Sequence, residues 1–136
     1  MKKIIKQYLK EQKGLSRSKI IKAMDHLVSQ EVKRLAGGKC ERCHRPSPKT
    51  GCSHYFSRRY IGTRWNLENL CWLDWGCHYN WAEKEKNPGG WYYDFMLKRL
   101  GEKKFEALKV KAYGVNRWPT SDLEILLDQF RKGKFI

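Results

Sequence analysis

The strongest hydrophobic pattern in the chain starts at Ser18 and ends before Gly37 and Gly38. Apolar residues recur there with a period of about 3.6, while lysine, arginine and aspartate occupy positions between them. The apolar positions are Ile20, Ile21, Met24, Leu27, Val28, Val32 and Leu35. This pattern predicts an amphipathic helix that ends at the glycine pair. A shorter apolar set in Met1–Lys13 predicts another helix or a basic arm.

The turn-forming segment Asn87–Gly90 precedes two further predicted helices. The first spans Trp91–Leu100 and stops before Gly101. The second spans Glu102–Tyr113 and ends at Gly114. We expect this second helix to bury Phe105, Leu108 and either Val110 or Ala112.

The start of the last predicted helix is marked by Ser121 and Glu124. A serine followed three residues later by a glutamate is a capping box, in which each side chain accepts a hydrogen bond from a free backbone N–H. We expect the buried face of this helix to contain Leu123, Leu126, Leu127 and Phe130.

Charge narrows the class of partner. The chain has 136 residues, a length that predicts one compact domain. It contains 29 lysines and arginines against 14 acidic residues, a net charge of +15. Residues 1–35 hold ten of the basic residues and three of the acidic ones, a net charge of +7. Such an excess favours a polyanionic partner, and nucleic acid is the leading candidate.

The apolar pattern argues against a membrane partner. No apolar run approaches the ~18 residues of a spanning helix, and no apolar segment follows Met1-Lys2-Lys3 as in a secretory signal. We therefore expect a cytoplasmic protein. Because the cytosol is reducing, its five cysteines are expected to be thiols or metal ligands, not disulfides.

Four of the cysteines have the spacing of a structural zinc site. Cys40 and Cys43 are separated by two residues, as in a tight turn whose thiolates bind one metal ion. Cys71 and Cys77 follow about thirty residues later. Four thiolates would form a closed tetrahedral site that stabilises a segment with few aliphatic residues. Cys52 is left over and could replace one of the four.

The second cysteine pair is irregular, because five residues separate Cys71 from Cys77 instead of the usual two. The three extra residues can shift the helix register and bring Asp74 towards either the cysteine site or a catalytic ion, so Asp74 is a secondary candidate ligand. Reduced core cysteines without a metal are the other alternative.

Three polar residues in and beside the cysteine pairs could carry chemistry. His54 lies between the pairs, and a histidine with a pKa of ~6.5 can take a proton from water at neutral pH. Asn69 lies two residues before Cys71, and His78 follows Cys77 directly. Hydrolysis of a phosphodiester needs an activated water and a cation that neutralises the charge developing on the phosphate.

The order of these residues resembles the HNH, or ββα-metal, nucleases. In that family a histidine on the first strand is the general base, an asparagine braces the hairpin loop, and a His or Asn after the last cysteine binds the catalytic ion. The resemblance implies these roles for His54, Asn69 and His78. It also implies Mg²⁺ or Mn²⁺ as the catalytic ion, beside structural Zn²⁺ on the cysteines.

The segments His54–Tyr60 (HYFSRRY) and Thr63–Asn66 (TRWN) are similar to the core of the phage NinG (Rap) recombination family. Met96–Gly101 and Trp118–Thr120 are similar to its carboxy-terminal part, so the resemblance covers about Cys40–Lys134. It implies a phage protein that acts in the host cytoplasm on branched DNA, for example as a Holliday-junction resolvase. Because two symmetric cuts call for two active sites, we expect a homodimer.

The chain departs from these families at two places. Ser53 stands where many HNH enzymes have a metal-binding aspartate, and His78 stands where the NinG pattern has asparagine. Asn80 follows two residues later and is a rival ligand of the catalytic ion, with Glu83 as a further candidate.

Seven more residues are candidates for contacts with DNA. The arginines that follow His54 are placed to clamp phosphates, and lysines of the first predicted helix can grip the backbone. An exposed tryptophan can stack on unpaired bases. The candidates are Arg58, Arg59, Arg64, Lys19, Lys22, Trp72 and Trp75.

The sequence therefore predicts an α+β protein with a small zinc-stapled ββα-metal core. We expect a basic helical arm at 1–38, the nuclease core at 39–87 and a helical extension packed on that core at 88–136. The expected function is that of a metal-dependent DNA endonuclease selective for branched DNA. The alternatives are a non-catalytic zinc-containing module that binds nucleic acid, and a sequence-specific HNH nicking or homing endonuclease.

Overall fold

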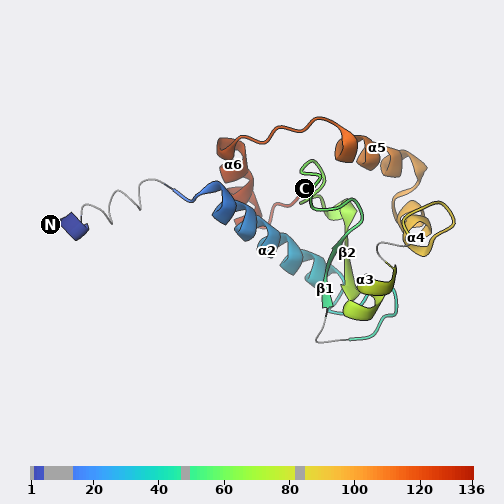
Figure 1. Ribbon diagram of the computed structural model, residues 1–136. Helices are drawn as coiled ribbons and strands as arrows, with labels where there is room; N and C mark the ends of the chain where they lie inside the picture. Colours follow the sequence, from blue (N-terminus) through green and yellow to red (C-terminus); the bar gives the residue numbers. More distant parts are fainter. Residues whose placement is uncertain (1, 5–13, 47–49, 82–84) are drawn as a thin grey trace.

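A two-stranded antiparallel sheet lies in the middle of the structure, with helices around it (Figure 1). The structure is a computed structural model that describes residues 2–4, 14–46, 50–81 and 85–136, with the backbone alone for 80 and 81. The elements are α2 (Arg17–Leu35), β1 (Thr50–His54), the 3₁₀ turn η1 (Leu67–Asn69), β2 (Leu70–Asp74), α3 (Trp75–Trp81), α4 (Trp91–Leu100), α5 (Glu102–Tyr113) and α6 (Thr120–Arg131). The chain is therefore α+β, as predicted.

The register of the two strands decides which residues share a face. Residues directly opposite each other in an antiparallel pair point to the same side, and successive residues alternate. Cys52 pairs with Trp72 and His54 with Leu70, so these four residues share one face. Ser53 pairs with Cys71 on the other face.

Helices α2 and α6 cover the face that carries Leu70 and Trp72. The apolar stripe of α2 packs against the buried side of α6 and against Trp65. The buried members of this core are Ile20, Met24, Val28, Val32, Trp65, Leu70, Trp72, Leu123, Leu126, Leu127 and Phe130. Figure 1 shows α2 and α6 side by side, although they come from opposite ends of the sequence.

Helices α4 and α5 cover the opposite face, where Cys71 and Leu73 point. Tyr55 and Phe56, which follow β1, fill the space between this face and the helices through edge-to-face ring contacts. The buried members of this second core are Cys40, Tyr55, Phe56, Cys71, Leu73, Cys77, Tyr92, Met96, Phe105, Leu108 and Ala112. An isolated two-stranded hairpin is marginal in water, so cover on both faces is what makes it stable.

The periodic patterns predicted most helix limits. Helices α4 and α5 have the predicted bounds, and Gly101 between them has a φ of 79°, which favours glycine. Ala112 is buried and Val110 is 70% exposed, so Ala112 is the inward residue of the two alternatives. Helix α2 ends just before Gly37 and Gly38, as predicted.

The predicted capping box at the start of α6 is wrong. The helix starts at Thr120, with Pro119 as the preceding residue and no side-chain capping bond. Ser121 therefore lies inside the first turn, too late to act as the cap. The predicted buried face is correct: Leu123, Leu126, Leu127 and Phe130 are all buried.

Most of Met1–Lys13 lies outside the described residues, so the predicted helix or arm there stays a prediction. Residues 2–4 are helical and exposed. Within the described part of the chain, no helix has both the length and the apolar character needed to cross a membrane.

Candidate functional site

Three thiols and one carboxylate converge where the sheet meets α3. Cys40, Cys43, Asp74 and Cys77 each offer one ligand atom, and these four atoms all lie within 4.8 Å of one another. The turn from Cys40 is closed by the His44 N–H, which donates to the Cys40 carbonyl at 2.8 Å. Ligands about 2.3 Å from a tetrahedral ion lie closer to one another than that limit. This cluster could bind a metal ion, and its composition is compatible with structural zinc.

Asp74 belongs to both the cluster and the start of α3. Its Oδ1 accepts from the Cys77 N–H at 2.7 Å, and its Oδ2 accepts from the Cys43 thiol at 2.8 Å. These hydrogen bonds lower the pKa of the Asp74 carboxyl to about 2, so the group is a carboxylate at neutral pH. The spacing from Asp74 to Cys77 equals that from Cys40 to Cys43. The cluster therefore consists of two pairs, Cys40 with Cys43 and Asp74 with Cys77, each with two residues between its members.

The predicted set of four cysteine ligands is corrected by this arrangement. Cys71 is not in the cluster, because alternation along β2 places its side chain on the other face from Asp74. Cys52 shares the face of Asp74 but is not in the cluster either, because it lies two residues beyond Thr50, the partner of Asp74 in the sheet. Asp74, predicted as a secondary candidate, takes the fourth position.

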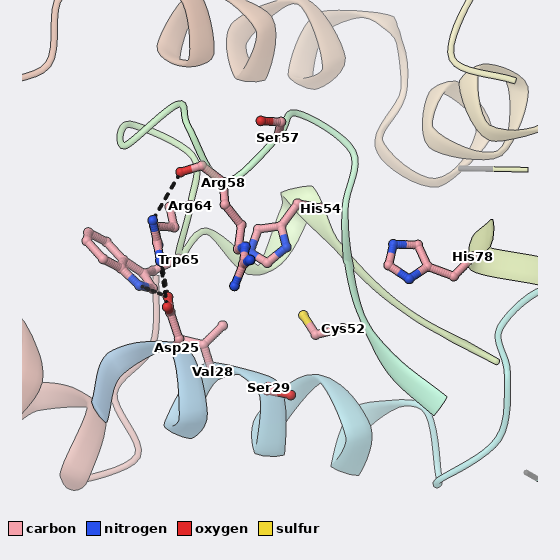
Figure 2. Close-up of a pocket in the computed structure, with 10 residues that line it drawn as sticks. All are labelled: Asp25, Val28, Ser29, Cys52, His54, Ser57, Arg58, Arg64, Trp65 and His78. Carbon is pink, nitrogen blue, oxygen red and sulfur yellow. Dashed lines mark hydrogen bonds and ion pairs between the residues drawn. The ribbon is translucent and has the colours of Figure 1, made fainter. Parts of the chain in front are cut away.

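A pocket of about 720 Å³ lies between the sheet, α2 and the loop that follows β1 (Figure 2). His54 enters it from the end of β1, and His78 enters it from α3. The lining residues are Asp25, Val28, Ser29, Cys52, His54, Ser57, Arg58, Arg64, Trp65 and His78. The structure thus brings together two of the three predicted catalytic side chains, with two of the three predicted arginines.

The imidazole of His54 is held neutral in this pocket. Burial, followed by the positive charge of Arg58, lowers its pKa to about 4. Asp25 and a hydrogen bond to the backbone of Arg64 oppose this shift with smaller effects. A neutral imidazole with one nitrogen bonded to backbone can accept a proton on the other. His54 therefore has the protonation state of a base at neutral pH.

The low pKa of His54 predicts how the fold responds to acid. Its folded-state pKa of about 4 lies below the ordinary value of 6.5, so protonation opposes folding. We expect the stability that this group contributes to be complete above pH 6.5 and to be lost as the pH falls towards 4. An NMR titration of the ring protons, with His54→Gln to assign them, measures this. A midpoint near 6.5 would contradict the buried environment.

Asn69 joins the two sides of the loop between the strands. Its Oδ1 accepts from the Phe56 N–H at 2.8 Å, and its Nδ2 donates to the Phe56 and Thr63 carbonyls at 2.9 and 3.1 Å. The side chain is completely buried. It does not line the pocket; it holds in place the backbone segment that follows His54. These contacts are those of a bracing residue.

Replacing Asn69 by alanine should destabilise the fold, because the Phe56 N–H and carbonyl lose a partner in a buried place and the Thr63 carbonyl keeps only the Asn66 N–H. We expect the free energy of unfolding to fall by about 2–4 kcal/mol, measured by urea denaturation. Asn66→Ala is the matched control, since the Asn66 side chain accepts a single hydrogen bond from the Glu68 N–H. We expect about 1 kcal/mol for this control. Equal losses would contradict a bracing role for Asn69.

Asp25 is a member of the pocket that the sequence analysis missed. Its carboxylate receives two bonds from the Arg64 guanidinium, at 3.0 and 2.6 Å, and one from the Trp65 indole N–H at 2.8 Å. These partners lower its pKa against the opposing effect of burial. Arg64 is thus already paired inside the protein, whereas Arg58 and Arg59 are exposed. Nothing in the sequence distinguishes Asp25 from other acidic residues on a helix surface.

The two tryptophans that were predicted to contact DNA have different environments. Trp72 is 6% exposed and packs in the core under α2, so its predicted contact with bases is wrong. Its place in the middle of β2, not in a loop, is the reason. Trp75 is 66% exposed at the start of α3. Lys19 and Lys22 are exposed on α2, where the prediction of backbone contacts stays open.

The pocket has few ligands for a hard divalent ion. Asp25 is the one carboxylate in its described lining, and it is paired with Arg64. Mg²⁺ prefers oxygen ligands, whereas imidazole suits transition-metal ions such as Zn²⁺, Fe²⁺ or Ni²⁺. The lining therefore fits an imidazole-tolerant ion better than Mg²⁺. The Asn80 side chain and Glu83 lie outside the described residues, so their predicted roles stay predictions.

No family model, curated protein or solved structure matches the chain. Its function is therefore inferred from the geometry of the site. What the described geometry offers is a neutral base, a second histidine and exposed arginine charge around one cavity. Close by, a Cys/Asp cluster could bind a metal ion where β2 passes into the helix that carries His78. Chemically, this combination suits proton abstraction next to an anionic group.

Proposed function

We propose that this protein is a metal-dependent DNA endonuclease of the HNH type. The observation that carries the proposal is that His54 and His78, from a strand and the helix after the next strand, line one pocket together with Arg58. A purely structural role for both histidines would not require them to share an open cavity. The resemblance of the segment from Cys40 to His78 to HNH nucleases supports the same function.

In the proposed reaction His54 takes a proton from water, and the resulting hydroxide attacks the scissile phosphate. The bond from phosphorus to the leaving 3′ oxygen breaks as the new bond forms, and that oxygen takes up a proton from solvent. The lowered pKa keeps the imidazole neutral when water binds, while it makes the ring a weaker base than one that titrates near pH 7. Asn69 acts through the loop backbone and positions His54 without touching the substrate. Arg58 would neutralise charge on the phosphate as the new bond forms. Arg64 can contribute only if it leaves Asp25.

His78 is the residue that we propose to hold the catalytic divalent ion, with Asn80 as a possible second ligand. When bound, such an ion would neutralise charge on the phosphate and on the leaving oxygen. Since the described lining offers imidazole more than free carboxylate, we expect an imidazole-binding ion such as Ni²⁺ to support a higher rate than Mg²⁺. Cleavage assays with each ion compare the two.

We propose Zn²⁺ for the cluster of Cys40, Cys43, Asp74 and Cys77. Four protein ligands leave no open coordination position, which is typical of a structural site. The site would tie the turn at Cys40 to the start of α3 and so support the helix that carries His78. Its role in the reaction is therefore indirect.

The substrate that we propose is branched DNA in the host cytoplasm, cut in the manner of a Holliday-junction resolvase by a homodimer. The net charge of +15 supports a nucleic-acid partner, and the resemblance to the NinG family suggests that this nucleic acid is branched DNA. A sequence-specific nicking or homing endonuclease would use the same chemistry on a different substrate.

A cleavage panel tests the proposed function. Purified protein is mixed with linear duplex, flap, replication fork and four-way junction, each with Mg²⁺ or Mn²⁺. We expect cleavage of at least one branched substrate in preference to the linear duplex. Binding to these DNAs without any cleavage would favour the alternative, a non-catalytic zinc-containing module. Preferential cutting of one sequence in the linear duplex would favour the nicking or homing enzyme.

A further inference from the structure

Two large aromatic side chains of α3 point into solvent instead of a core. Trp75 is 66% exposed and Tyr79 is 75% exposed. They lie one helical turn apart, and their ring centroids are 6.0 Å apart with a tilt of 39°. Together they form a continuous aromatic surface, which we call the α3 platform. Trp65 and Trp72, by contrast, are at most 6% exposed.

The platform borders a second pocket, of about 350 Å³, at the open end of the sheet. Its lining residues are Thr50, Gly51, Leu73, Trp75 and His78. This volume lies at the lower end of the ~300–1,000 Å³ range of pockets for small ligands. Gly51 leaves room there, because a Cβ built on it meets nothing within 4 Å. The lining is mainly apolar, with the Thr50 hydroxyl and the His78 imidazole as polar groups.

His78 lines this second pocket and also the pocket that contains His54. The second pocket and the proposed cutting site therefore share one side chain, that of His78. The protein carries a net charge of +15, which attracts the phosphates of a DNA strand and disfavours a basic partner protein.

We propose that the α3 platform binds an unpaired base of a DNA strand next to the cleavage site. The base stacks on Trp75 and Tyr79 and its edge enters the pocket beside Gly51. Stacking on aromatic side chains accepts any base, since every base has a π-face. A paired base inside a duplex cannot present that face, so the platform selects DNA with a branch, flap or gap. This inference rests on the proposed nuclease function and defines its substrate class.

Binding measurements without cleavage test the platform separately from the reaction. All variants are made on the His54→Ala background, without added divalent ion and without chelator, so that the metal cluster is undisturbed. The probe is a duplex with a single-stranded flap that carries 2-aminopurine at its first unpaired position. The fully paired duplex of the same sequence is the reference. The measured quantities are the ratio of the two dissociation constants and the quenching of 2-aminopurine fluorescence on stacking.

Three substitutions are expected to remove the preference for the flap. Trp75→Ala and Tyr79→Ala each delete half of the platform, and stacking of one base is worth roughly 5-fold or more in affinity. Gly51→Leu fills the pocket, and its Cβ meets no neighbouring atom within 4 Å. We expect each to lower the flap-to-duplex preference at least about 5-fold and to reduce the quenching. Trp75→Phe keeps a ring and should retain most of both signals.

Val115→Ala is the matched control, because Val115 is 93% exposed and lies outside both pockets. Zinc content and circular dichroism of each variant show whether the fold is intact. An unchanged preference in folded Trp75→Ala and Tyr79→Ala would overturn the platform, even if the wild-type protein cuts DNA. A lost preference in a protein that never cuts would support the platform and count against the nuclease function.

Discussion

Replacing Asp74 by alanine is expected to release the bound metal ion, whereas replacing Cys71 by alanine is expected to leave it in place. Asp74 lies in the group of four ligand atoms, and Cys71 points into the core on the other side of β2. Elemental analysis of freshly purified protein should give about one equivalent of zinc for the wild type and for Cys71→Ala. We expect less than half an equivalent for Asp74→Ala and Cys77→Ala.

Loss of the ion should also lower stability strongly. The ligands tie the turn at Cys40 to α3, so loss of the ion removes a link between these two segments. A loss of about 4 kcal/mol would lower the melting temperature by roughly 14 °C in a domain of this size. Thermal unfolding with and without a chelator measures the change.

Asp74 also caps α3, so a control must separate capping from metal binding. Asparagine is as good a cap as aspartate but a weaker metal ligand. We therefore expect Asp74→Asn to keep the helix start while it loses metal affinity, and Asp74→Ala to lose both. Full zinc occupancy in Asp74→Asn and Asp74→Ala, with loss in Cys71→Ala, would restore the set of four cysteines.

Replacing His54 by alanine is expected to reduce cleavage by about 10²–10⁴-fold, the usual contribution of a general base. DNA binding should change little, because the charge that attracts the backbone comes from lysines and arginines elsewhere. The decrease should therefore appear in kcat and not in KM. Single-turnover cleavage of the preferred branched substrate is the measurement.

The matched control for His54 is His26→Ala. His26 is an exposed histidine on α2 and does not line the pocket. Its loss should leave the rate unchanged within about twofold. If His54→Ala cleaves as fast as His26→Ala, the assignment of the base is refuted, whatever nuclease activity the protein has. Zinc content and melting temperature of both variants exclude misfolding as the cause.

The helices could be predicted because one side of each is buried and the other is exposed to solvent. The 3.6-residue pattern of α2 and the glycines at 101 and 114 contain that information in adjacent residues. The strands are different: β2 is buried on both faces, so it shows no alternation between apolar and polar residues. Trp72 was misplaced for this reason, since nothing local distinguishes a core strand from an apolar loop.

The site was predictable where ligands or bases are rare residue types at short spacing. His54, His78 and the pair of Cys40 and Cys43 could be identified in this way. Asp25 could not, because it meets Arg64 only through folding of residues 39 positions apart. The choice between Cys71 and Asp74 depended on strand direction, which decides which of them faces the metal and which faces the core.

The contact between α2 and α6 affects how the chain can fold during synthesis. The apolar side of α2 is only partly covered, by Trp65 and β2, until residues 120–131 have left the ribosome, because α6 supplies much of that core. The four residues of the metal cluster, at 40 to 77, are all available well before then. The centre of the chain can therefore assemble around its ion while the two ends are still apart, and the arrival of α6 completes the protein.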